Sequence, residues 1–204
     1  KKGEELRIGL RFLLKEANLD NTFEDLSLLA EVYLSHSLRI ARHELMKNFG
    51  KPLIKDSKGK THECGFAIIG MGKFGGYELD FGSDLDVIFV YEGEGQTEGT
   101  ESVIIQDNVK NLPLIPSLLR RGNGEVSKNK NFPKSIEKLP EKKSIQNQEY
   151  FIKLVTMIYD LASAITPAGY SYRIDTDLRP EGKKGILTLP LSEFKKYFEE
   201  RARV

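Results

Sequence analysis

Two aspartates, Asp84 and Asp86, stand at the start of an apolar run, Val87 to Val90, and carry the strongest chemical signal in this chain. Side chains alternate along a strand, so both carboxylates are expected on the same face. Paired carboxylates suit Mg²⁺, which takes oxygen ligands and commonly binds through one or two carboxylates plus substrate phosphates. Gly82 and Ser83 precede them and let the backbone approach a polyphosphate. We interpret this segment as a site for metal-assisted nucleotidyl transfer.

A glycine-rich turn, Gly70 to Gly76, comes before these residues. It fits the dinucleotide-binding pattern G-x-G-x-x-G, and Glu92 lies near the acidic position of that pattern. A dinucleotide fold needs a full helix between its first two strands. Between Gly76 and Asp84 there is room for only a turn or two, which argues against that interpretation.

The alternative is a phosphate-holding turn that leads into a metal-binding strand. Lys73 would meet a phosphate, and the backbone amides of Gly82 and Ser83 would cradle it. A structural interpretation makes Asp84 and Asp86 ordinary turn residues, a common use of Asp beside Gly. Asp86 argues against this, because a carboxylate entering a buried strand is costly unless it is paired or metal-bound.

Two-metal sites need a further carboxylate, and Asp175 is the best supplier. It lies in the segment Tyr170 to Leu178, which we predict to be a strand with Arg173, Asp175 and Asp177 on one face. The alternative is a surface ion pair between Arg173 and Asp175, worth about 0–1 kcal/mol.

Hydrophobic periodicity predicts the elements that position these residues. Helices are expected over 6–16, 22–49 and 147–165, with a last helix capped by Ser192. Thr22 is the expected N-cap of the second helix and Gly50 its terminator. Residues 51–60 are interpreted as a polar loop, and strands are expected over 66–69, 84–91, 170–178 and 186–189. The fold class is therefore α/β, with an N-terminal helical segment (1–50) leading into a catalytic domain (51–204).

Residues 99–146 are expected to form an insertion. Between Lys110 and Lys143 there are nine basic residues and three acidic ones, and four prolines interrupt the segment. A loop this long without regular structure is usually functional or disordered. We expect a flexible basic insertion, the alternative being an arm that docks an acidic partner or phosphate.

Composition limits the protein class. The chain has 204 residues, 39% hydrophobic, and a net charge of +1, which gives no overall case for nucleic-acid binding. A single cysteine, Cys64, excludes an internal disulfide and fits a reducing compartment. No apolar run approaches the ~20 residues that span a bilayer. We expect a cytoplasmic protein that is not bound to a membrane, and, since no Met begins the sequence, a fragment of a longer chain.

The chemical segments resemble the glutamine synthetase adenylyltransferase family, whose catalytic domains belong to the nucleotidyltransferase superfamily. The matching segments are Gly70 to Leu79, Ser83 to Asp86, and Tyr172 to Asp175 together with Leu178, Arg179 and Pro180. The similarity runs from about Cys64 to the end of the chain, apart from the insertion. The helix at 22–49 resembles the leading helix of the family more loosely.

The resemblance implies a nucleotidyltransferase-like fold, in which a small mixed sheet is flanked by helices. It implies reversible modification of one tyrosine of glutamine synthetase. In one direction the tyrosine hydroxyl attacks the α-phosphate of ATP, and in the other phosphate attacks the AMP-tyrosine link and releases ADP. Family members carry an AMP-removing half and an AMP-adding half. The segments Tyr172 to Asp175 and Arg179 to Gly182 look more like the AMP-removing half.

The resemblance also implies roles for particular residues. The ligands of Mg²⁺, with two ions expected, would be Asp84, Asp86 and Asp175. Phosphate contacts would come from Gly82 and Ser83, and support for phosphate charge from Lys73 and Arg179. The family responds to glutamine and to a small trimeric nitrogen-signalling protein, but nothing in this sequence locates either site.

Two positions depart from the family pattern. Asp80 stands where the family usually has Asn, and Asp177 where it usually has Arg. These additional carboxylates either shift the affinity for metal or face solvent. Two further functions stay open, namely a nucleotidyltransferase for another hydroxyl acceptor and a catalytically silent nucleotide-sensing domain.

Overall fold

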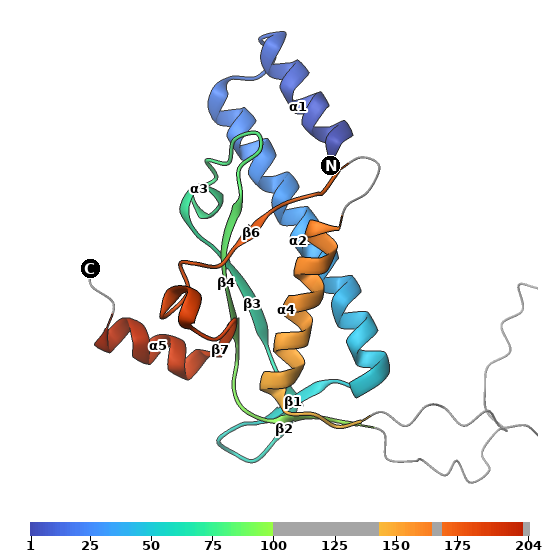
Figure 1. Cartoon of the computed structure of the whole chain (residues 1–204), viewed down its shortest axis with the longest axis vertical. Coiled ribbons are helices and arrows are strands. Elements are labelled where there is room, and N and C mark those ends of the chain that lie inside the picture. Colours follow the sequence, from blue (N-terminus) through green and yellow to red (C-terminus); the bar gives the residue numbers. More distant parts are fainter. Residues whose placement is uncertain (100–142, 165–168, 202–204) are drawn as a thin grey trace, which may run out of the picture.

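The computed structural model describes residues 1–99, 143–164 and 169–201. The chain opens with two helices, α1 (Lys2–Leu13) and the long α2 (Leu19–Phe49). Helix α4 (Asn147–Ser163) lies beside α2, and both helices run along one side of the strands (Figure 1). Helix α5 (Leu191–Glu200) lies on the opposite side (Figure 1). The predicted α/β architecture is confirmed.

The start of α2 lies one turn earlier than predicted. Asn18 is the N-cap, and its side-chain Oδ1 accepts a hydrogen bond from the backbone amide of Asn21 at 2.8 Å. Thr22 is not the cap, because its hydroxyl donates to the carbonyl of Asn18 from inside the helix. Asp25 takes no part in a capping box and instead pairs with Arg11 at 2.7 Å, joining α1 to α2. Gly50 ends the helix, as predicted.

The main sheet is built around β4 (Leu85–Tyr91). Strand β3 (Phe66–Gly70) pairs antiparallel with it along one edge. The other edge is shared by two short parallel strands, β6 (Ile174–Asp175) near the start of β4 and β7 (Thr188–Pro190) near its end. Antiparallel and parallel pairing around one strand confirms the small mixed sheet.

The strand predicted over 170–178 is much shorter than expected. Only Ile174 and Asp175 pair with β4. From Thr176 onward the chain turns, since the guanidinium of Arg179 donates to the carbonyl of Thr176 at 2.9 Å and folds the segment back. A short 3₁₀ turn, η2 (Gly182–Lys184), follows.

A second sheet, with strand order β2-β1-β5, replaces the polar loop predicted over 51–60. Strands β1 (Pro52–Lys55) and β2 (Thr61–Glu63) form an antiparallel hairpin, and β5 (Gln96–Thr97) pairs with the other edge of β1. The side chain of Asp56 closes the hairpin by accepting from the amides of Lys58 and Lys60. The prediction of a loop was wrong. Strand β1 is only partly buried, and the charged residues around it obscure its alternating pattern in the sequence.

The predicted insertion begins and ends beside β5. Its greater part, 100–142, lies outside the described residues, as does residue 165 at the end of the helix predicted over 147–165. On the near side of α4, the amide of Thr97 donates to the carbonyl of Ile145 at 2.8 Å, and the hydroxyl of Ser144 donates to the carbonyl of Thr97 at 2.7 Å. Thr97 and residues 144–145, which lie on either side of 98–143 in the sequence, are therefore bonded to each other.

The last helix begins at Leu191, directly after Pro190 at the N-cap position. Ser192 therefore lies inside the first turn and does not cap α5, as had been predicted. Proline suits this place because its fixed φ leads into a helix and its missing amide hydrogen is not needed there.

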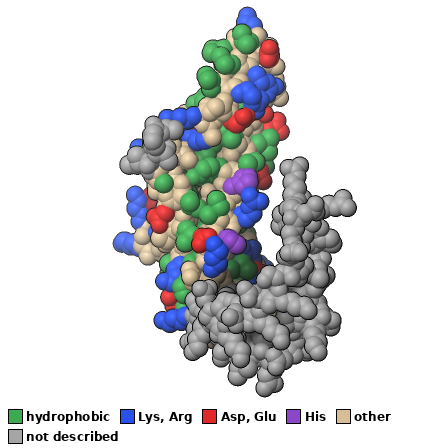
Figure 2. Space-filling model, turned by 90° about the vertical axis from the view of Figure 1, so that its right-hand side faces the viewer, with side chains coloured by type: hydrophobic (Ala, Val, Ile, Leu, Met, Phe, Trp, Pro, Cys, Tyr) green, Lys and Arg blue, Asp and Glu red, His purple; other side chains and the backbone are tan. Residues whose placement is uncertain are grey.

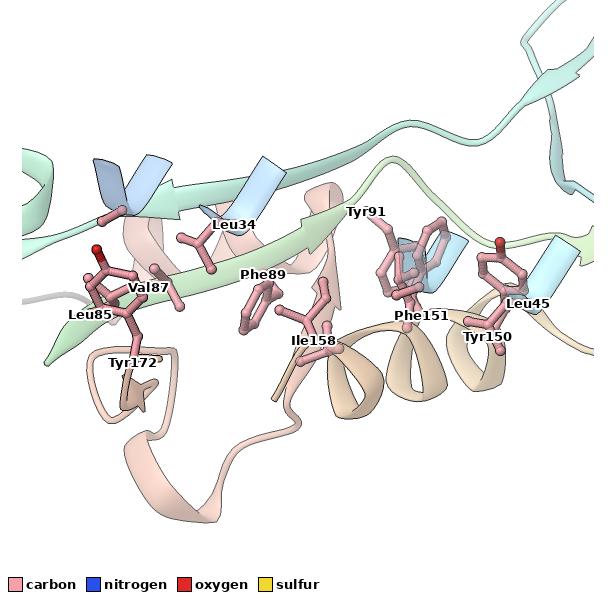
Figure 3. Close-up of a cluster of buried hydrophobic side chains, with 14 of the residues drawn as sticks. Leu34, Leu45, Leu85, Val87, Phe89, Tyr91, Tyr150, Phe151, Ile158 and Tyr172 are labelled. Carbon is pink, nitrogen blue, oxygen red and sulfur yellow. The ribbon is translucent and has the colours of Figure 1, made fainter. Parts of the chain in front are cut away.

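One hydrophobic core joins the N-terminal helices to the sheet (Figure 3). Buried side chains along β4 point towards α4 and α2 (Figure 3). Leu85 lies near Tyr172 at one end of the strand, and Tyr91 lies near Phe151 towards the other end (Figure 3). Aromatic rings dominate the latter end, where Phe151 stacks on Tyr91 at 4.9 Å between centroids and on Phe66 at 5.2 Å.

The outer face of the helices is mixed in character. Figure 2 shows hydrophobic side chains scattered among charged ones on this side of the molecule. In α1, only Ile8 is buried, whereas the exposed large side chains are Leu6, Leu10, Phe12 and Leu13. Within the described residues, none of the helices combines the length and the apolar character needed to cross a membrane.

Candidate active site

The glycine turn packs directly against Asp86. After β3, the amide of Met71 donates to the carbonyl of Asp86 at 2.8 Å. Helix α3 (Gly72–Gly75) is a single turn that then leads back towards β4. Because β3 and β4 are antiparallel and no crossover helix separates them, the rejection of a dinucleotide fold is confirmed.

Two glycines of this turn are required by close contacts. Gly72 has φ +51°, and a Cβ there would stand 2.7 Å from Oδ2 of Asp86. A Cβ on Gly75 would stand 2.4 Å from the carbonyl oxygen of Gly70. The glycine pattern therefore reflects the packing of backbone around a carboxylate.

Replacing Gly72 with alanine is expected to lower the rate of the reaction at the candidate site about ten- to hundred-fold. The free energy of unfolding should change by less than the activation free energy. The new methyl group pushes the Asp86 carboxylate aside, and a displacement of about 1 Å at a reacting centre can cost a factor of that size. The rate and the melting temperature of the variant provide the test. Gly59→Ala is the control, since that glycine also has positive φ (+78°) but no atom within 4 Å of a built Cβ. A normal rate in the Gly72→Ala variant would contradict the assignment of Asp86 to the candidate site.

Strand pairing brings Asp86 and Asp175 together. They are register partners in the parallel pair of β4 and β6, so their side chains share one face. Burial, then the charge of Asp175, then that of Asp84 raise the pKa of Asp86 above its usual range. The amide of Asp177 donates to Oδ1 of Asp175 at 2.7 Å and fixes that carboxylate. Asp86 therefore lies within electrostatic reach of both other predicted carboxylates.

The donor chemistry of this site fits Mg²⁺. The three groups are hard oxygen donors, and a bound cation would offset both the burial and the repulsion that raise the pKa of Asp86. In the described parts of the chain, no three carboxylate, histidine or cysteine side chains lie close enough to form a preformed metal cluster. Mg²⁺ commonly completes its shell with substrate phosphates and water, which needs fewer protein ligands.

Lys73 and Ser83 converge on Asp80, a departure from the family pattern that we expected either to shift the affinity for metal or to face solvent. Asp80 accepts from Nζ of Lys73 at 2.8 Å and from the hydroxyl of Ser83 at 2.5 Å. These two bonds lower the pKa of Asp80, and the bond to Asp80 raises the pKa of Lys73. Sequence reasoning singled out Asp80 only as a departure from the family. Its position three residues before Ser83, where Asp often closes a turn, was the available signal.

Arg179 holds the loop after β6. Its guanidinium donates to the carbonyl and the hydroxyl of Thr176, at 2.9 and 2.7 Å, and to the carbonyls of Lys183 and Gly185, each at 3.2 Å. These bonds use most of its donors, so its support for phosphate charge remains a prediction. The alternative ion pair between Arg173 and Asp175 is not found among the described residues, since Arg173 lies over the ring of Tyr170, 5.5 Å from its centroid.

A hollow of about 340 Å³ opens beside the predicted phosphate contacts. Gly82, Ser83 and Asp84 form one wall, and residues 169–173 together with the start of α1 form the others. This volume lies at the lower end of the range for small-molecule sites, about 300–1,000 Å³. The hollow therefore has room for part of a small ligand next to Asp84, whereas Asp86 and Asp175 do not line it.

Known proteins are similar to this chain over almost its whole length. Two relatives are named bifunctional glutamine synthetase adenylyltransferase/adenylyl-removing enzymes. The protein of Alteromonas mediterranea is 30% identical over 199 residues, and that of Thioalkalivibrio sulfidiphilus 29% identical over 200 residues. Each match covers 98% of this chain and 16% of the relative, so the chain spans about one sixth of their length.

The similarity also reaches further than the motifs indicated. The sequence profile of the glutamate-ammonia ligase adenylyltransferase family matches residues 1–111 and 132–204. It therefore includes the N-terminal helices and much of the segment that we had interpreted as an insertion, leaving out 112–131. The chain belongs to the glutamate-ammonia ligase adenylyltransferase family.

Proposed function

We propose that this chain is a nucleotidyl-transfer domain that acts on a tyrosine of glutamine synthetase and removes AMP from it. The observation that carries the proposal is the pairing of Asp86 with Asp175 on one face of the sheet, beside a glycine turn packed on Asp86. The names of the relatives, which include both adenylylating and adenylyl-removing activities, support the acceptor. The segments Tyr172 to Asp175 and Arg179 to Gly182, which look more like the AMP-removing half, support the direction.

In the proposed reaction an oxygen of inorganic phosphate attacks the phosphorus of the AMP-tyrosine link. The bond from that phosphorus to the tyrosine oxygen breaks, the tyrosine oxygen takes up a proton, and ADP leaves. Bound Mg²⁺ would neutralise the charge of the transferring group. Asp84, Asp86 and Asp175 would hold the metal, with two ions expected, and the amides of Gly82 and Ser83 would orient the phosphates. Phosphate is already an anion, so the reaction needs little or no general base.

Lys73 and Arg179 would support the negative charge of the phosphates. The remaining donor capacity differs between them. Arg179 is largely used by its own loop, whereas in the described part of the chain the ammonium of Lys73 donates to one carboxylate, that of Asp80. We therefore assign the larger phosphate contribution to Lys73. Glutamine and a trimeric nitrogen-signalling protein are proposed as effectors, and we assign neither of them to residues of this chain.

The test is to incubate the chain with Mg²⁺, inorganic phosphate and adenylylated glutamine synthetase, and to follow ADP. Release of ADP, matched by loss of AMP from the tyrosine, is the expected result. Transfer of AMP from ATP to unmodified glutamine synthetase, without ADP release in the first assay, would reverse the proposed direction. If neither ADP release nor AMP transfer is detected, glutamine synthetase is rejected as the acceptor. A different hydroxyl acceptor or a nucleotide-sensing role is then favoured.

A further inference from the structure

The carboxylate of Asp80 bonds two of the residues that the proposed function assigns to phosphate, Lys73 and Ser83. Its Oδ2 accepts from Nζ of Lys73 at 2.8 Å, and its Oδ1 accepts from Oγ of Ser83 at 2.5 Å. The backbone amide of Ser83 also donates to the carbonyl of Asp80 at 3.3 Å. One residue therefore links the single turn of α3 to the turn that precedes Asp84.

We propose that a ligand phosphate takes Lys73 from Asp80 when it binds, so that Asp80 weakens and tunes the affinity of the site for phosphate. The inference rests on the proposed function and specifies how this chain regulates its own phosphate contacts. It makes Asp80 a positioning residue, which acts on the ligand through Lys73 and Ser83.

The exchange is favoured by the properties of the ion pair. The side chains of Lys73 and Asp80 are 59% and 45% exposed, so water screens their attraction and the pair contributes little to stability. A phosphate carries more charge than a carboxylate and, like a carboxylate, forms charge-assisted hydrogen bonds with an ammonium. Once Lys73 has turned to phosphate, the Asp80 carboxylate is left next to an anion, and their repulsion opposes binding.

Asparagine at position 80 separates the two contacts of the carboxylate. Its amide oxygen can still accept from the hydroxyl of Ser83, which keeps the turn before Asp84. Its amide nitrogen is a donor and cannot hold the ammonium of Lys73. Asp80→Asn therefore releases Lys73 alone, whereas Asp80→Ala releases Lys73 and Ser83 together.

The experiment measures the dissociation constant of ADP by calorimetry, in Mg²⁺ buffer of low ionic strength. Asp80→Asn is expected to bind ADP about two- to five-fold more tightly than wild type, the range that an exposed ion pair can supply. The gain should vanish when Lys73→Met is added and should shrink at high salt. Asp80→Ala should gain less than Asp80→Asn, because it also loosens Ser83.

Glu44→Gln is the matched control for charge. Lys47 and Glu44 form a pair of nearly the same length, 2.7 Å, with 54% and 46% exposure, but near the far end of α2. Its removal should leave the affinity for ADP unchanged. If wild type binds ADP, three results would overturn the inference. They are an equal gain of ADP affinity in Glu44→Gln, a gain that persists when Lys73→Met is added, and no gain in Asp80→Asn. Failure of wild type and all variants to bind ADP would overturn the proposed function together with it.

Discussion

Replacing Asp86 with asparagine is expected to lower ADP release about a thousand-fold, the rate equivalent of the several kcal/mol that metal-assisted charge stabilisation supplies. Asparagine keeps the shape of the side chain but removes the negative charge that would hold Mg²⁺. The rate is measured with adenylylated glutamine synthetase and phosphate in excess. Asp84→Asn should behave in the same way, since both carboxylates belong to the proposed site.

The fold of Asp86→Asn should be intact and no less stable. The pKa of Asp86 is raised in the folded protein, so the folded state holds its proton to higher pH than the unfolded state does. Stability therefore falls as pH rises from the ordinary carboxyl pKa, about 3.9, through the raised value. Above that window the ionised carboxylate opposes folding, and asparagine removes this opposition. In metal-free buffer at pH 7 the melting temperature should equal or exceed that of wild type.

Asp56→Asn is the control for Asp86→Asn. Asp56 accepts backbone hydrogen bonds in the β1–β2 turn, and an asparagine oxygen can accept them too. This variant should keep both rate and stability. A near-normal rate in Asp86→Asn would remove Asp86 from the site, and a large fall in its melting temperature would mean that lost activity reports unfolding.

Replacing Phe151 with alanine is expected to destabilise the protein by about 3–5 kcal/mol, the usual cost of removing a buried ring. Phe151 is 1% exposed, and its ring packs within 4.9–5.3 Å of the rings of Tyr91, Phe66 and Tyr150, centroid to centroid. In a domain of this size each kcal/mol shifts the melting temperature by about 2–4 °C, so a fall of about 10 °C is expected. Urea unfolding followed by circular dichroism gives the corresponding free energy.

Ile152→Ala is the matched control for the core. Ile152 is the next residue of α4, has the same helical backbone, and is 36% exposed. Its replacement should change stability by only about 0.5 kcal/mol. A Phe151→Ala protein as stable as Ile152→Ala would show that the aromatic stack contributes far less than its burial indicates.

The long helices and the central strand could be predicted from the sequence, because their burial is written in hydrophobic periodicity. Strand β1 and the true length of β6 could not. Their pairing depends on partners far away in the chain, β5 for β1 and β4 for β6. From local composition alone, β1 was therefore predicted as a loop and β6 as a long strand. The cap at Asn18 was missed for a related reason, since several polar residues in 18–25 could begin the helix and packing selects among them.

The carboxylates of the candidate site could be proposed from the sequence because a charged residue at the start of an apolar strand is costly and therefore noticeable. The contact of Gly72 with Asp86 and the bridge through Asp80 were not found. Each joins segments on either side of a turn, and its geometry depends on backbone angles that residue types alone do not specify. Lys73 was singled out as a cation for phosphate, but its bond to Asp80 was not predicted.

The bonds between Thr97 and residues 144–145 have a consequence for how this family can vary. They fix both ends of the segment between them to the same place in the fold. The entropy lost on closing a chain between fixed ends grows only with the logarithm of its length, so doubling the length costs only about 0.6 kcal/mol. Added sequence between Thr97 and Ser144 therefore changes the free energy of folding little. A family pattern that omits 112–131 is compatible with the same core.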